Sequence, residues 1–426
     1  MSNDSIKPTQ ELERISSLDF LRGIAILGIL FINIENFAYP DSWSPYKFGF
    51  NSSIDHSTRF YVYFLTQGKF YNMFALLFGV GFYIFLERLE KKDLGLKAMD
   101  IYARRLLWLF VIGLAHSYLI WSGDVLYHYA ICGLLLFPFR SIRSKNLIVV
   151  IVLLASLLMV KSYEQTIRRQ NSYNDYMKIS NMPENQRAED EIKKVESWER
   201  RLTIKTPDTT KVEMRKPTYL AGLNETYKHA SAHKGLLYYQ SLLFPSLIVM
   251  IMGIVLYRSG IFTDYHVWKY YWLISLIVLT LGLVINYFRF YHWTYDYFKP
   301  ILSIWKGWVF TFPKELLGIG YILVFNGVYQ KFLKSVKFKI ITNIGQMALT
   351  NYIFQNILLG LIFYGYGLAK FNQYSRFELL GIVAAIWTIQ ILLSSLWMSK
   401  FKQGPLEWVW KKLTYNSFKD NKSETI

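Results

Sequence analysis

Three side chains near the middle of the chain have the types and spacing that proton transfer needs. His116 and His128 each lie about six residues from the tight turn Ser122-Gly123, so an antiparallel helical hairpin would hold them at similar depth. Asp124 precedes His128 by four residues, which would place the carboxylate and the imidazole on one helix face. An aspartate that orients a histidine, opposite a second histidine, is typical of a general base or a proton relay. The alternative is a helix pair held together by hydrogen bonds between polar side chains.

A second candidate site lies at the start of the first apolar segment. Residues 17–33 are long enough to cross a bilayer as a helix, yet Asp19 and Arg22 stand at the beginning. The two side chains are three residues apart and can pair, which lowers the cost of placing either charge at the membrane boundary. They form either part of a working site or an interfacial ion pair that only anchors the helix.

Further polar side chains interrupt the apolar segments. Such groups are costly in hydrocarbon and usually face a cavity or a partner helix. We expect them to line a polar interior that binds substrate, with helix packing as the alternative role for each. They are Asn33, Asn36, Lys69, Glu315, Asn351 and Gln355.

Helices that cross a membrane must position these residues. With 53% hydrophobic and 18% aromatic residues, the chain is too apolar for soluble domains, and we expect an all-α polytopic bundle of about ten transmembrane helices. The expected segments are 18–38, 69–86, 106–121, 124–139, 146–162, 237–257, 268–288, 307–329, 344–367 and 377–399. The single cysteine, Cys132, excludes a disulfide within the chain and a cysteine metal cluster, and we expect no bound metal.

The distribution of basic residues predicts the orientation. The formal net charge is +18, and the cations lie in alternate loops, which all become cytoplasmic if both termini are cytoplasmic. Basic loops against anionic lipids account for the charge, so we expect membrane-lipid contacts in the cell membrane and no nucleic-acid partner. The expected division is a cytoplasmic tail at 1–17, helices at 18–162, a polar extracytoplasmic insertion at 163–236, helices at 237–403, and an interfacial helix with a cytoplasmic tail at 404–426.

Several motifs, in order, resemble a known family. The motif Leu18-Asp19-Phe20-Leu21-Arg22-Gly23 is followed by matching segments at 68–82, 123–140, 345–352 and 404–408. Together they resemble the YeiB-like DUF418 family, multi-pass membrane proteins described as transport-associated or of unknown function. The opening motif is also distantly similar to that of transmembrane acyltransferases, including the heparan-glucosaminide N-acetyltransferase-like proteins. That similarity implies an acyl group taken from cytoplasmic acyl-CoA and delivered to a glycan or lipid acceptor outside.

The resemblance to acyltransferases also implies roles for individual residues. In those enzymes a histidine near the external loop before the second span serves the transfer, and His56 has about that position here. On this hypothesis His128 or His56 acts as the base, Asp124 orients it, and Asn33 or Asn351 stabilises an oxyanion.

Cytoplasmic arginines would then bind the donor. We expect Arg104, Arg105 and Arg140 to hold the phosphates of CoA. The competing hypothesis is a transporter or transport-associated protein for a small solute, in which the same polar residues line a path. A membrane scaffold with a polar core is a third reading. The absence of a convincing internal repeat favours the enzyme slightly. The sequence leaves open the donor, the acceptor, the role of the insertion and the oligomeric state.

Overall fold

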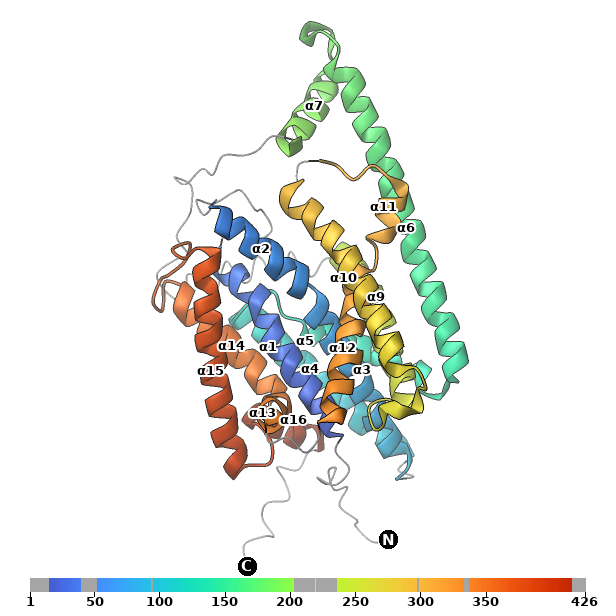
Figure 1. Cartoon of the computed structure of the whole chain (residues 1–426), viewed down its shortest axis with the longest axis vertical. Coiled ribbons are helices and arrows are strands. Elements are labelled where there is room, and N and C mark those ends of the chain that lie inside the picture. The colour runs from blue at the N-terminus through green and yellow to red at the C-terminus, as the bar shows by residue number, and fades with distance from the viewer. Residues whose placement is uncertain are drawn as a thin grey trace, which may run out of the picture.

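The computed structural model describes residues 15–39, 52–92, 95–202, 219, 236–296, 299–332 and 337–415, and these residues contain helices and no strand. The chain is therefore an all-α helical bundle, as the sequence predicted (Figure 1). The helices that matter below are α1 (Ser16–Ala38), α2 (Ser53–Thr66), α3 (Lys69–Glu90), α4 (Leu96–Leu119), α5 (Leu126–Leu136), α6 (Ser144–Ser180), α7 (Glu189–Leu202), α9 (Leu236–Arg258), α10 (Tyr271–Tyr295), α11 (Ile304–Val309), α12 (Pro313–Lys331), α13 (Lys337–Gln346), α14 (Ala348–Phe363), α15 (Arg376–Lys400) and α16 (Pro405–Tyr415).

Helix α1 is the core of the bundle. It packs against α2, α3, α12, α13, α14 and α15. Its apolar residues surround the helix instead of forming a stripe, which is the pattern of a fully enclosed helix. Gly23 lies directly against the backbone of Ile341, where a side chain would collide, so the small residue allows α13 to approach closely. The predicted ion pair at the start of α1 is present, with Arg22 Nη1 2.8 Å from Asp19 Oδ1.

Several helices are long and apolar enough to cross a membrane. Six such helices, with α2–α3 and α11–α12 each counted as one, occur in the described part of the chain. A seventh results if α13 and α14, which meet at 83°, form one bent span. The chain is therefore a multi-pass membrane protein. By length and composition, the described residues contain fewer spanning helices than the ten expected from the sequence. Three expected spans are too short or too charged at one end: α5 has only 11 residues, the first turns of α4 carry Lys97, Asp100, Arg104 and Arg105, and the apolar part of α9 is the shorter segment Leu242–Arg258.

Two segments differ from the loops and ends that the sequence predicted. Residues 53–66, expected within an external loop, form α2, which Ser52 caps by accepting a hydrogen bond from the Asp55 N–H. Gly68 separates α2 from α3 with φ +79°, a conformation that favours glycine. Helix α6, expected to end near residue 162, continues to Ser180, and α7 folds back on it through Val195 and Trp198.

The bundle has two distinct ends. Helices α2 and α7 and the last turns of α10 lie at one end, and α13 and α16 lie at the other (Figure 1). These are called the α2 end and the α16 end below. At the α16 end, the Glu407 carboxylate accepts hydrogen bonds from the N–H groups of Leu349 and Thr350 and so caps the start of α14.

Candidate functional site

Asp124 and His116 form a buried pair at the connection between α4 and α5. Asp124 Oδ1 lies 2.8 Å from His116 Nδ1, and both side chains are almost completely buried. The other carboxylate oxygen accepts the N–H groups of Leu126 and Tyr127 at 2.8 and 3.1 Å. Asp124 therefore serves two purposes, since it caps the start of α5 and orients the imidazole on α4. We call Asp124 and His116 the dyad.

The expected pairing of Asp124 with His128 is wrong. It assumed that both residues stand in one helix, where a spacing of four brings side chains together. Helix α5 begins only at Leu126, so Asp124 lies outside it and its side chain turns toward α4. The expected convergence of all three side chains therefore holds for Asp124 and His116 alone.

The far side of the His116 ring faces amide side chains from α14 and α1. His116 Nε2 lies 3.0 Å from Asn356 Nδ2, and Asn33 Nδ2 lies 3.5 Å from Asn356 Oδ1. Because the Asn356 Nδ2 group can only donate, Nε2 accepts from it and the ring proton is on Nδ1, which faces the Asp124 carboxylate. This is the tautomer that a general base requires. The Tyr352 ring packs beside the imidazole, with 5.2 Å between centroids. Sequence reasoning selected Asn33 but gave Asn356 no role.

His128 belongs to a second polar cluster. Its Nε2 lies 3.0 Å from Ser246 Oγ on α9 and 3.6 Å from Cys132 Sγ. Tyr71 on α3 extends the cluster, with its hydroxyl 3.1 Å from Ser246 Oγ. We call these four residues the His128 cluster. Ser246 stands in an apolar segment, and no spacing in the sequence marked it.

The polar side chains of α14 connect that helix to α15 and α1. Gln355 donates to Gln390 Oε1 at 2.8 Å and to the Ile26 carbonyl at 3.1 Å. Asn351 donates to Ser394 Oγ at 3.0 Å and accepts from Gln390 at 3.1 Å. All four side chains are buried and hydrogen-bonded to one another, which is the arrangement of helix packing. Asn36 donates to the Ile32 carbonyl of its own helix.

A buried ionic cluster at the α2 end was not anticipated. Glu35 Oε2 lies 3.6 Å from Arg376 Nε and accepts from the Tyr63 hydroxyl at 3.2 Å. The Arg59 guanidinium stacks over the Tyr63 ring and donates to Thr294 Oγ1. His56 on α2 is partly buried and interacts electrostatically with Arg59 and Arg376 of this cluster. The signal for the cluster was available, since charged residues inside apolar helices are rarely without a partner.

Lys69 and Glu315 approach each other near the same end. Lys69 is fully buried, donates to the Tyr63 carbonyl at 2.9 Å, and lies over the Phe290 ring. Glu315 on α12 attracts the charged form of Lys69, whereas Lys314 and Arg289 repel it. Sequence reasoning missed Lys314 and Arg289 as neighbours of Lys69.

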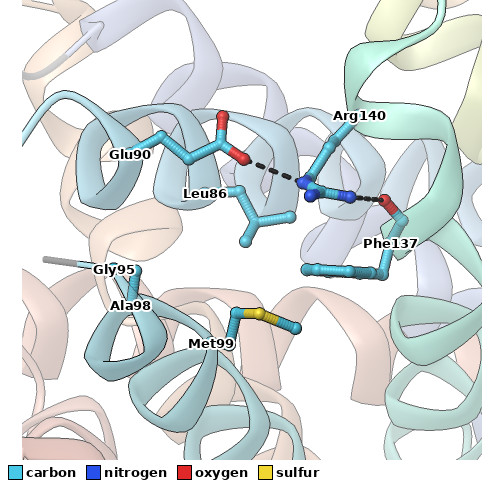
Figure 2. A pocket seen from close by; sticks show the side chains of 7 residues that line it. All are labelled: Leu86, Glu90, Gly95, Ala98, Met99, Phe137 and Arg140. Carbon is cyan, nitrogen blue, oxygen red and sulfur yellow. Dashed lines mark hydrogen bonds and ion pairs between the residues drawn. The ribbon is translucent and has the colours of Figure 1, made fainter. Parts of the chain in front are cut away.

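A pocket opens at the α16 end of α3. Its volume is about 230 Å³, and its walls include Leu86, Met99 and Phe137, with Glu90 and Arg140 at one side (Figure 2). Arg140 Nε donates to Glu90 at 2.8 Å, and its guanidinium stacks on Phe137. Apolar walls beside one arginine are suited to a ligand with an apolar part and an anionic part.

The two other predicted donor-binding arginines have different surroundings. Arg104 pairs with Asp100 at 2.7 Å and is partly exposed. The Arg105 guanidinium lies between the rings of Phe85 and Trp410, and the Trp410 indole donates to its carbonyl. Arg105 thus anchors α16 to α4. No group of three histidine, cysteine, aspartate or glutamate side chains in the described ranges could hold a metal ion.

The amino-acid sequence matches one family and is similar to bacterial proteins that are uncharacterized. Residues 256–417 match the family described as "Protein of unknown function (DUF418)". The chain is 29% identical to the uncharacterized protein YeiB of Escherichia coli (strain K12), covering 95% of this chain and 97% of that protein. It is 27% identical to the uncharacterized protein YxaH of Bacillus subtilis (strain 168), covering 97% of each chain. No solved structure matches.

Proposed function

We propose that this chain, a YeiB-like protein with a DUF418 domain, is a membrane acyltransferase whose general base is His116. The observation that carries the proposal is the dyad. A buried carboxylate lies 2.8 Å from Nδ1, and the Asn356 amide that donates to Nε2 selects the tautomer whose Nε2 accepts a proton. The acceptor hydroxyl or amine takes the place that Asn356 marks beside Nε2.

The residues around His116 supply the remaining chemistry. Nε2 removes the proton from the acceptor, whose oxygen or nitrogen attacks the thioester carbonyl of the donor. The Asn33 and Asn356 side chains offer N–H groups to the oxyanion that forms. The C–S bond then breaks, and the protonated His116 returns its proton to the leaving CoA thiolate. The Asp124 carboxylate beside Nδ1 stabilises the imidazolium.

The donor would enter at the other end of the bundle. The pocket beside Arg140 combines apolar walls with a cation, and Arg104 lies on the neighbouring helix α4. Met99 of that pocket and His116 stand on the same helix, 17 residues apart, which corresponds to about 26 Å. The charged part of a donor held at the α16 end would therefore lie about 26 Å from His116, and the arm that carries the thioester would have to reach along α4 to the acceptor.

The proposed orientation places the termini and the α16 end in the cytoplasm of a cell membrane, and α7 outside. The acceptor is then an extracytoplasmic glycan or lipid. Ser197 on α7 is exposed and provides a test. A membrane-impermeant thiol reagent should label Ser197→Cys in intact cells, because α7 is then outside. The native Cys132 is buried and should give little background labelling. Labelling that requires cell lysis would show that α7 lies in the cytoplasm, which is the opposite of the proposed orientation.

A transfer assay tests the proposed activity directly. Purified protein in liposomes, given acyl-CoA with a labelled acyl group, should release free CoA and label lipid or glycan acceptors added to the vesicles. His116→Gln should lower the rate by about a hundredfold or more. His56→Gln and His128→Gln examine the two bases expected from the sequence. If either of them abolishes transfer in folded protein while His116→Gln does not, the dyad is not the base.

One observation favours the transporter as a second candidate. Helices α13 and α14 meet at 83°, and α2 and α3 are separated at Gly68, and broken helices often line the binding sites of transporters. In this case, liposomes should accumulate a solute without any consumption of acyl-CoA. His116 would then belong to a proton path, and a pH gradient should drive uptake.

A further inference from the structure

Three cations from three helices meet near the α2 end with one carboxylate among them. Lys69 Nζ lies 3.9 Å from the centroid of the Phe290 ring, and the Arg289 guanidinium lies 5.8 Å from the same centroid. The stem of Lys314 packs against Gly68, where an added Cβ would approach Lys314 Cδ to 2.6 Å. Lys69, Arg289 and Lys314 thus surround the junction of α2 and α3.

The charges at this junction are not balanced by the protein. Among the described residues, Glu315 is the carboxylate that interacts favourably with the charge of all three cations. One oxygen of Glu315 is buried without a hydrogen bond. Lys69 is fully buried, and the other two cations are partly buried. Charging three basic side chains beside one carboxylate in such surroundings is costly unless an anion completes the site.

The start of α12 adds to the attraction for an anion. Phe312 precedes the helix and offers no side-chain cap, so the first N–H groups of α12 have no acceptor from it. Pro313 occupies the first position, and Lys314 and Glu315 follow. The positive end of the helix dipole therefore points to the same region as the three cations.

The depth of the cluster indicates which anions reach it. Lys69 begins α3 and Glu90 ends it, 21 residues or about 32 Å away, which is close to the thickness of the hydrocarbon core. Exposed Trp305 and Trp308 on α11 lie just before α12 in the chain, as expected for a helix at the headgroup level. The cluster thus lies at the membrane interface opposite the Arg140 pocket.

We propose that Lys69, Arg289 and Lys314 form a binding site for a phosphate group, supplied by a phospholipid headgroup or by a soluble phosphate or phosphomonoester. The net charge of the cluster matches a phosphate with a charge of −1 to −2. The site is separate from the dyad, and it does not depend on acyl transfer.

Thermal unfolding of the full chain in a phosphate-free maltoside detergent tests the site. Inorganic phosphate or phosphatidylglycerol should raise the unfolding temperature, measured against sodium chloride at equal ionic strength. Native mass spectrometry should show phosphatidylglycerol retained by the wild-type protein. A response to the lipid alone identifies a headgroup site, and a response to inorganic phosphate alone identifies a soluble ligand.

Two charge-removing variants separate binding from general electrostatics. In Lys314→Gln and Arg289→Gln, the phosphate concentration that gives half of the increase in unfolding temperature should be at least ten times that of the wild type. Without phosphate, Lys314→Gln should unfold at the same or a higher temperature than the wild type, because repulsion between cations is relieved. Arg289→Gln also loses the hydrogen bond to the Phe310 carbonyl, so only its response to phosphate is compared. Lys306→Gln on α11, an exposed cation nearby, should leave the response unchanged. The proposal fails if neither anion stabilises the wild type beyond chloride, or if both cluster variants respond like the wild type.

Discussion

The two histidines of the α4–α5 hairpin have similar burial but very different partners. His116 is held by a carboxylate on one side and an amide on the other. His128 faces the hydroxyl of Ser246 and the thiol of Cys132, and no carboxylate is hydrogen-bonded to it among the described residues. Burial alone therefore does not distinguish a general base from a packing histidine. The charged neighbour decides, because a carboxylate beside the ring stabilises its protonated form and a hydroxyl or a thiol does so far less.

The largest effect should follow from Asp124→Asn. The amide cannot stabilise a protonated His116, and it replaces the charged acceptor for the N–H groups of Leu126 and Tyr127. We expect acyl transfer to fall about 10²- to 10⁴-fold, measured as initial rates of CoA release in liposomes. Asp264→Asn, at an exposed carboxylate in another loop, serves as the control. A rate within threefold of the wild type would reduce Asp124 to a helix cap.

A smaller loss should follow from Asn356→Leu. The substitution removes the partner of His116 Nε2 and one N–H group for the oxyanion, while the dyad itself remains. We expect the transfer rate to fall by about 10- to 100-fold, at a cost in stability of about 1–3 kcal/mol for the unpaired groups. Ile357→Ala, at an exposed position on the same helix, should change neither. An unchanged rate would move the acceptor site away from Asn356.

The His128 cluster should affect stability more than activity. His128→Gln and Ser246→Ala should each lower the free energy of unfolding by about 1–2 kcal/mol while the transfer rate changes less than threefold. The double variant should show coupling of about 0.5–1.5 kcal/mol, since the two side chains share a hydrogen bond. His266→Gln, on an exposed loop, is the matched control. Loss of acyl transfer in folded His128→Gln protein would show that His128, and not only His116, is needed for activity.

The smallest effect should come from Arg140→Gln. The guanidinium is partly exposed and shared with Glu90, so its loss removes one charge-assisted contact to the donor. We expect the KM for acyl-CoA to rise about 3- to 10-fold with kcat little changed, and the difference to shrink as salt is added. Lys91→Gln, an exposed cation just beyond α3, should have no effect on KM.

Much of the fold followed from apolar segments that the sequence displays directly. The hydropathy of α1, α6, α10 and α15 predicts helices that cross a membrane, because backbone groups in lipid must be satisfied within the segment. The Asp19–Arg22 pair followed from a spacing of three within one continuous helix. Helix α2 was missed because its polar first turn, with Asp55 and His56, resembled a loop.

The partners of the polar residues were decided by the tertiary structure. Spacing predicts contacts only within one helix, and a single residue outside it changes the partner, as Asp124 does by preceding α5. Asn33 and Asn356 are 323 residues apart, and no local pattern relates them. The sequence by itself determined an all-helical membrane bundle and placed two histidines inside its apolar segments. Which histidine receives the carboxylate was settled only by the packing of α4 against α5 and by the contact of His116 with α14, because such packing fixes which side chains from different helices meet.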